Sequence, residues 1–255
     1  MKTFFETRPV VGSLILWAAW LVFVMLSALV LAALFPGLAG YGSGASASLV
    51  IILVGVVLVA ALLAAFRWWR MAGFVGPSQW RNLRLLWLPA LTLLLPLLGG
   101  VRPLEPAVIG TLLVGYVATG FVEEGLYRGA ILGLLRPTGI WRAVLISSLL
   151  FGLAHLGNIL LRGTPGLIAL QALGSATGGV GLAALRLRTR TIWPLIALHA
   201  LADLFIQMGG LPIPLASAAH DIFLLVYGIY LLRPSILPQV EAEPEERRAL
   251  EPSRA

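Results

Sequence analysis

Two adjacent glutamates and an arginine stand in the middle of a long apolar run. Glu123, Glu124 and Arg128 are the charged residues of the stretch 106–135. Charged side chains at membrane depth are costly, and they mark functional sites by default. Glu124 precedes Arg128 by four residues, the order and spacing that favour an ion pair on a helix. Glu123 points to another side of the helix and has no such partner, so we expect it to act as a general base.

Two further apolar runs carry histidines that can complete a hydrolytic site. Phe151 precedes His155 by four residues, and His199 precedes Asp203 by the same interval. A carboxylate one helical turn from a histidine can orient or charge the imidazole. The chain has no cysteine, which excludes a thiol nucleophile and thiolate metal ligands. Glutamate, histidine and aspartate together can activate water, with or without a divalent metal.

A metal such as zinc is one way to use these side chains. Glu123, His155 and His199 are of the types that bind zinc. They come from three different apolar runs, however, so their spacing is not a metal-binding signature. Motifs of other intramembrane proteases are absent, including the His-Glu-x-x-His helix of metalloproteases.

The composition predicts an integral membrane protein. Of the 255 residues, 59% are hydrophobic and 11% are charged, whereas a soluble domain carries roughly 25% charged residues. We expect one transmembrane domain over residues 1–233, with the motif-bearing core at 106–232. Residues 234–255 are charged and poor in apolar side chains, which predicts a disordered tail.

The apolar runs predict an all-α bundle of about eight transmembrane helices. A run of about 17 or more apolar residues is long enough to cross a bilayer as a helix. The third expected span is short and contains two prolines. The candidate spans are Val11–Phe35, Leu49–Phe66, Leu85–Leu98, Pro106–Leu135, Trp141–Leu156, Gly166–Leu185, Thr191–Met208 and Pro214–Leu232.

The basic residues predict the orientation. Fifteen of the eighteen flank the expected spans on one side, and the alternate loops hold Arg102 and Arg162. Because loops rich in arginine and lysine stay in the cytoplasm, both termini are expected there. This distribution also explains the net charge of +7 without a nucleic-acid partner. The composition suggests a prokaryotic protein of the inner (plasma) membrane.

The candidate residues are expected at a similar depth. Counted from the nearest basic loop, Glu123, His155 and His199 lie roughly 14 to 20 Å from the cytoplasmic boundary at 1.5 Å per residue. Polar residues scattered independently would not agree in this way. His220 and Asp221 are adjacent on another expected helix and face different directions, which favours a structural or supporting role for them.

Taken in order, these residues resemble a known family. Glu123-Glu124-x-x-x-Arg128, Phe151-x-x-x-His155 and His199-x-x-x-Asp203 are similar to the three motifs of the CPBP intramembrane endopeptidases. This is the CAAX-protease and bacteriocin-processing (ABI) family, which is related to the type II CAAX prenyl endopeptidases.

The resemblance implies about eight helices around a water-filled cavity open to the cytoplasm. It implies that Glu123 and His155 activate the hydrolytic water and that Arg128 holds Glu124 in place. His199 and Asp203 would stabilise the oxyanion of the tetrahedral intermediate. An ionised aspartate cannot donate to an oxyanion, so Asp203 is either protonated there or buttresses His199.

The predicted function is therefore intramembrane hydrolysis of peptide or membrane-protein substrates within the lipid bilayer. A proton-coupled transporter could use the same buried acids and histidines as a relay, but matched broken spans are not apparent in the sequence. A non-catalytic scaffold or immunity protein of the same fold is the third hypothesis, and the complete set of charged motif residues argues against it. The sequence leaves the substrate open.

Overall fold

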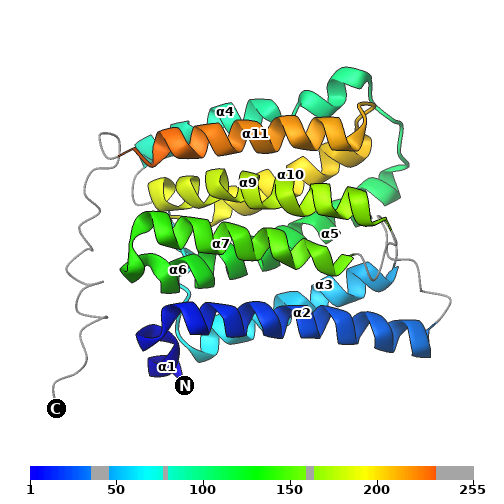
Figure 1. Ribbon diagram of the computed structural model, residues 1–255. Coiled ribbons are helices and arrows are strands. Elements are labelled where there is room, and N and C mark those ends of the chain that lie inside the picture. Colours follow the sequence, from blue (N-terminus) through cyan, green and yellow to red (C-terminus); the bar gives the residue numbers. More distant parts are fainter. Residues whose placement is uncertain (36–45, 77–79, 159–163, 234–255) are drawn as a thin grey trace, which may run out of the picture.

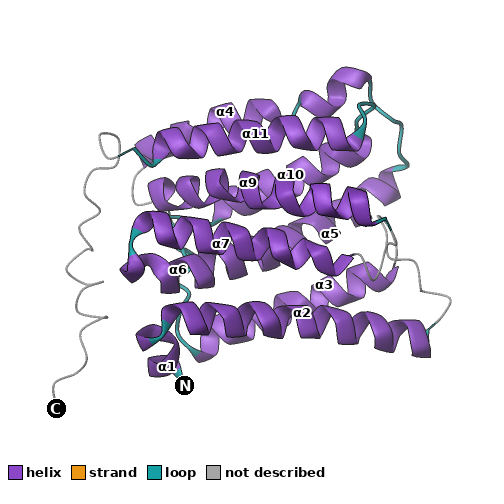
Figure 2. Cartoon of the chain, viewed as in Figure 1, coloured by secondary structure: helices purple, strands orange, loops and turns teal. Residues whose placement is uncertain are grey.

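The described part of the chain is helical, which confirms the expected fold class (Figures 1 and 2). The structure is a computed structural model, and it describes residues 1–35, 46–76, 80–158 and 164–233. A single isolated antiparallel bridge joins Val101 to Gly209 within these ranges. The expected tail, 234–255, lies outside the described residues.

The elements follow one another with short connections. The labels of Figure 1 are used throughout, with η marking 3₁₀ and π segments. The elements are α1 (Lys2–Thr7), α2 (Pro9–Leu34), α3 (Ser46–Ala65), η2 (Trp80–Leu86), α4 (Trp87–Thr92), η3 (Leu95–Gly99), α5 (Pro106–Glu123), η4 (Glu124–Ile131), α6 (Leu132–Leu135), η5 (Arg136–Thr138), α7 (Ile140–His155), η6 (Leu156–Asn158), α9 (Pro165–Thr189), α10 (Trp193–Met208) and α11 (Ile213–Leu231).

Seven helical stretches of the described chain are long and apolar enough to cross a membrane. The chain is therefore an integral, multi-pass membrane protein. The stretch expected as the seventh span, Thr191–Met208, forms α10, which has 16 residues and falls below the length of the others. The seven are Pro9–Leu34, Ser48–Ala65, Trp80–Gly99, Pro106–Thr138, Ile140–Asn158, Pro165–Thr189 and Ile213–Leu231. Eight crossings remain a prediction.

Prolines shape the third span. Residues 80–99 form two 3₁₀ segments with the short α4 between them. Pro89 and Pro96 lack the backbone N–H that a continuous α-helix needs, so the ladder is interrupted. The span is nevertheless 20 residues long, two longer than the shortest of the other candidates.

The first motif departs from α-helical geometry. The helix expected over 106–135 is α-helical only to Glu123, and from Glu124 to Ile131 it winds as a π-helix with i→i+5 hydrogen bonds. All eight residues of this segment, η4, are buried. Such windings are rare and occur frequently at functional sites. The span expected over 106–135 is present as one helical stretch, and only its winding changes at Glu124.

Helix α9 forms the centre of the bundle, with α7 on one side and α11 on the other (Figure 1). Its contact with α11 is a backbone-to-backbone approach at Gly181 and Gly228. A Cβ atom placed on Gly228 would lie 2.7 Å from the Cα of Gly181. Small residues at helix interfaces in membranes allow this approach, which van der Waals packing then stabilises.

We predict that Gly228→Ala destabilises the protein by about 1–3 kcal/mol, because the added methyl group forces α9 and α11 apart. Gly110→Ala is the matched control, since Gly110 also lies in a helix but has open space around its Cα. Both changes bring the same gain in helix propensity. Thermal unfolding in detergent measures the effect, and equal melting temperatures for the two variants would contradict the proposed contact.

Candidate active site

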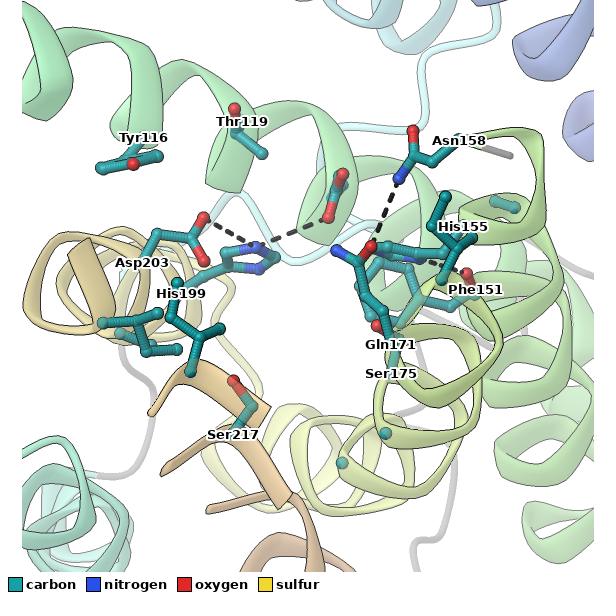
Figure 3. Close-up of a pocket in the computed structure, with 18 of the residues that line it drawn as sticks. Tyr116, Thr119, Phe151, His155, Asn158, Gln171, Ser175, His199, Asp203 and Ser217 are labelled. Atoms are coloured by element: carbon teal, nitrogen blue, oxygen red, sulfur yellow. Dashed lines mark hydrogen bonds and ion pairs between the residues drawn. The ribbon is translucent and has the colours of Figure 1, made fainter. Parts of the chain in front are cut away.

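A cavity of about 1190 Å³ lies inside the bundle. Helices α2, α3, α5, α7, α9, α10 and α11 all contribute to its walls. Four residues expected to be catalytic line it: Glu123, His155, His199 and Asp203. In Figure 3, His199 and Asp203 lie on one side of the pocket, and His155 and Phe151 lie across from them. The expected site residues are thus brought together from three helices.

Behind the cavity wall, Glu124 and Arg128 form a buried ion pair. Arg128 Nη1 lies 3.2 Å from Glu124 Oε1, and the two side chains are 1% and 0% exposed. The guanidinium also lies over the ring of Phe151, 3.9 Å from its centroid. A cation stacked on a desolvated aromatic ring adds roughly 2 kcal/mol of attraction. The phenylalanine of the second motif therefore holds the arginine of the first.

The ion pair reaches His199 through a shared oxygen. His199 Nδ1 lies 2.9 Å from Glu124 Oε1, the same atom that binds Arg128. An ionised carboxylate only accepts hydrogen bonds, so Nδ1 must be the donor. The other ring nitrogen, Nε2, is therefore the one left to act in the cavity.

His199 Nε2 lies between two further carboxylates. Glu123 Oε2 is 3.5 Å away and Asp203 Oδ2 is 3.7 Å away. Both carboxylates are partly exposed, at 20% and 34%, whereas Glu124 is fully buried. The adjacent glutamates are thus separated as the sequence predicted: Glu124 belongs to the packed interior and Glu123 faces the cavity. The prediction that Glu123 has no partner close in sequence holds, but His199 is its neighbour in space.

His155 is held by its own helix. Its Nδ1 lies 2.9 Å from the carbonyl oxygen of Phe151, one turn earlier in α7. A carbonyl oxygen can only accept, so Nδ1 carries the hydrogen and Nε2 of a neutral ring has a free lone pair. The edge of the imidazole also meets the face of Phe151, with centroids 4.8 Å apart. This fixes both the tautomer and the ring plane.

The three expected metal ligands line the same cavity but are not grouped as a metal site among the described residues. Among the described residues, no group of three or more histidine or acidic side chains is arranged to hold a metal ion. Nδ1 of His155 and Nδ1 of His199 are each hydrogen-bonded, as is usual in metal-binding histidines, so the donors open to a metal are the two Nε2 atoms and the carboxylate of Glu123. A metal at this site stays a prediction.

Several cavity residues were not predicted to act there. His220 and Asp221, expected in a structural role, both line the cavity. His220 Nδ1 lies 2.8 Å from Thr92 Oγ1, and the carboxylate of Asp221 rests against Gly174 and Gly178 of α9. The adjacency of a histidine and an acid was visible in the sequence, but their depth near the cavity depended on how α11 packs.

Tyr127 is a second omission. It stands beside Arg128 in the first motif, contacts the ring of Phe151 at 5.0 Å between centroids, and lines the cavity. Its position next to the arginine was the available signal. A π-helical turn changes which neighbours face the same side, so α-helical spacing did not identify it.

A comparison with protein families assigns the central region. Residues 105–205 match the family described as type II CAAX prenyl endopeptidase Rce1-like. The match spans all three motifs and confirms the resemblance drawn from them. This is a family of proteases, and its members act as endopeptidases. A comparison with curated proteins finds no match for the chain.

We predict that Arg128→Met destabilises the protein by about 3–5 kcal/mol, because it leaves the carboxylate of Glu124 buried without its cation. Arg142→Met is the matched control, since Arg142 is exposed at the start of α7. Thermal unfolding of the purified protein measures both. If Arg128→Met melted together with the control, the ion pair would not support the site.

Proposed function

On the premise that its central region is Rce1-like, we propose that the protein is an intramembrane endopeptidase that hydrolyses peptide bonds of membrane-associated substrates. One observation carries the proposal. A single cavity holds Glu123, His155, His199 and Asp203, while the ion pair that orients His199 is packed outside it. Charges that only stabilised the fold would not need a cavity large enough for a peptide segment.

The proposed base is Glu123. It is partly exposed to the cavity and makes no ion pair with an arginine among the contacts described, so its carboxylate can take a proton from water. His155 offers the lone pair of Nε2 from the opposite wall, which can accept a hydrogen bond from the same water and hold it in position. The attacking oxygen then adds to the scissile carbonyl carbon, and the C–N bond breaks as the amine nitrogen takes up the proton that Glu123 removed from water.

The proposed electrophilic partner is His199. When protonated it donates from both nitrogens, with Nδ1 directed at Glu124 and Nε2 facing the cavity. An oxyanion formed near Nε2 would receive a preoriented donor in a site shielded from bulk water. The contact between Asp203 Oδ2 and Nε2 supports buttressing of His199 as the role of the aspartate.

We predict that Glu123→Gln, and separately His155→Ala, lowers cleavage by about 100-fold or more, the usual contribution of a general base. The measurement is a comparison of membrane-protein fragments in cells that express wild type or variant, which also identifies the substrate. Glu105→Gln is the matched control, since Glu105 is exposed just before α5.

Both active-site variants should remain folded: Glu123→Gln should melt at the wild-type temperature, and His155→Ala slightly below it, because His155 also packs against Phe151. Full fragment yield in both would contradict the endopeptidase proposal. Uptake of a solute into proteoliposomes that is lost in Glu123→Gln would instead favour a carrier.

The metal-assisted version of the reaction has its own test. Because no three donors are grouped around one point among the described residues, we predict that chelators leave the yield of cleavage fragments unchanged and that the purified protein holds zinc well below one equivalent. Fragment release from isolated membranes, with and without chelator, measures this. Loss of cleavage that added zinc restores would contradict the prediction and return Glu123, His155 and His199 to the role of ligands.

A further inference from the structure

Hydrogen bonds between distant segments define one end of the bundle. Trp68 Nε1 donates to Glu6 Oε1 at 3.2 Å, joining the chain after α3 to α1. The amide of Ile192 donates to the carbonyl of Gly73 at 2.9 Å, so the chain after α3 is also joined to the start of α10. In Figure 1 the turn between α6 and α7 and the last turn of α11 lie at this same end, on the left. We call it the basic end.

A second set of bonds defines the opposite end. The amide of Arg102 donates to the carbonyl of Met208 at 2.8 Å, and the amide of Gly210 donates to that of Gly100 at 2.9 Å. The loop before α5 and the turn between α10 and α11 therefore meet there. The starts of α9 and α11 lie beside them, on the right in Figure 1. We call it the open end.

Charge is distributed very unevenly between the two ends. Apart from the buried Arg128, the described residues include twelve cationic side chains at the basic end and Arg102 at the open end. The twelve are Lys2, Arg8, Arg67, Arg70, Arg81, Arg84, Arg136, Arg142, Arg186, Arg188, Arg190 and Arg233. By the positive-inside rule the basic end is cytoplasmic.

The basic half of the bundle is filled with side chains. Apolar residues with no exposed area come from η4, α6, α7, α9, α10 and α11 and meet there. They include Ile131, Leu135, Ala143, Val144, Leu185, Ile192, Leu195 and Leu231. A close-packed interior of this kind leaves no passage wider than a water molecule. Among the described residues, this half therefore offers a peptide no channel to the site.

The other half of the bundle is hollow. The cavity begins at the level of Tyr127 and His199 and continues to the open end, where Arg102, Thr164 and Pro214 line it and are exposed. The part of α2 that lines it, from Trp20 to Met25, is the middle of that helix, and the part of α3 that lines it, from Ser48 to Ile52, is the beginning of that helix, farther from the basic end. The cavity thus communicates with the surroundings on the side away from the basic residues.

We propose that the active site receives its substrate from the non-cytoplasmic side of the membrane. This inference rests on the proposed endopeptidase function and adds the side from which the peptide arrives. A cytoplasm-facing cavity was expected from the family resemblance, and cytoplasmic basic loops were expected from the charges. The cavity opens at the end opposite the basic loops, so both expectations cannot hold for this structure. The twelve-to-one distribution of cationic side chains favours cytoplasmic basic loops.

The orientation narrows the class of substrate. The scissile bond lies in the non-cytoplasmic half of the bilayer or just outside it, in a protein anchored to the membrane. A soluble cytoplasmic peptide, or a protein held only at the cytoplasmic surface, would have to cross the filled half of the bundle. The substrate is therefore a membrane-anchored polypeptide with its cleavage site on the outer side.

Single-cysteine labelling tests this directly, because the natural chain has no cysteine and no background. Arg142→Cys marks the basic end, Arg102→Cys the open end and Ser217→Cys the cavity wall (Figure 3). Each variant is exposed to a small membrane-impermeant maleimide in right-side-out vesicles and in inverted vesicles prepared from the same cells.

We expect Arg102→Cys and Ser217→Cys to be labelled in right-side-out vesicles and Arg142→Cys in inverted vesicles. The labelling ratio between the two preparations should be at least about tenfold in each case, the margin of a 1.4 kcal/mol preference. Labelling of Arg142→Cys from outside, labelling of Ser217→Cys only from inside, or absence of Ser217→Cys labelling in both preparations would each overturn the proposal.

The outcome is separable from the endopeptidase test. Expected labelling together with unchanged cleavage in Glu123→Gln would overturn the function and leave the orientation intact. Reversed labelling together with loss of cleavage in Glu123→Gln would overturn the orientation and leave the function intact.

Discussion

The arrangement of the candidate site depends on one carboxylate oxygen, Oε1 of Glu124. Glu124 Oε1 accepts from Arg128 Nη1 and from His199 Nδ1, so a single buried carboxylate ties the π-helical segment η4 to α10. Phe151 stacks beneath the guanidinium and brings α7 to the same point. A charge in this position would be prohibitive alone, and it is tolerated because both of its neighbours are hydrogen-bonded to it. The three motifs are therefore one physical unit that uses a buried ion pair to orient an imidazole.

This unit explains why the adjacent glutamates differ. Glu124 is held in the buried ion pair with Arg128, and its neighbour Glu123 is turned toward the cavity, 3.5 Å from His199 Nε2. His155 faces them from a helix that closes its own hydrogen bond to Phe151. In both histidines Nδ1 is held by a hydrogen bond, and Nε2 is the nitrogen that stays available for the reaction. Such preorganisation means that little reorganisation remains for the moment of reaction.

The sequence predicted which polar residues share the cavity, but it did not predict the cavity's surroundings. Membrane depth and i,i+4 spacing were sufficient to select Glu123, His155 and His199, because both follow from helix geometry alone. The winding of η4 was not predictable, since i→i+5 hydrogen bonding leaves no periodic signal in eight residues. The direction in which the cavity opens was also hidden, because it depends on which half of the bundle receives the large apolar side chains. The position of Asp221 in the cavity wall was not predictable either, because it depends on how closely α11 approaches the glycines of α9.

The filled half and the hollow half of the bundle also divide the protein mechanically. Apolar burial, which supplies most of the cohesion, is concentrated beside the basic end, while the walls of the cavity have fewer neighbours to hold them. The free energy of local opening should therefore fall along each long helix from one end to the other. Amide hydrogen exchange would be slow near Ile131 and Leu185 and faster around the cavity rim. Flexible walls of this kind would let a hydrophobic segment part the helices while the catalytic groups, anchored in the rigid half, stay in register.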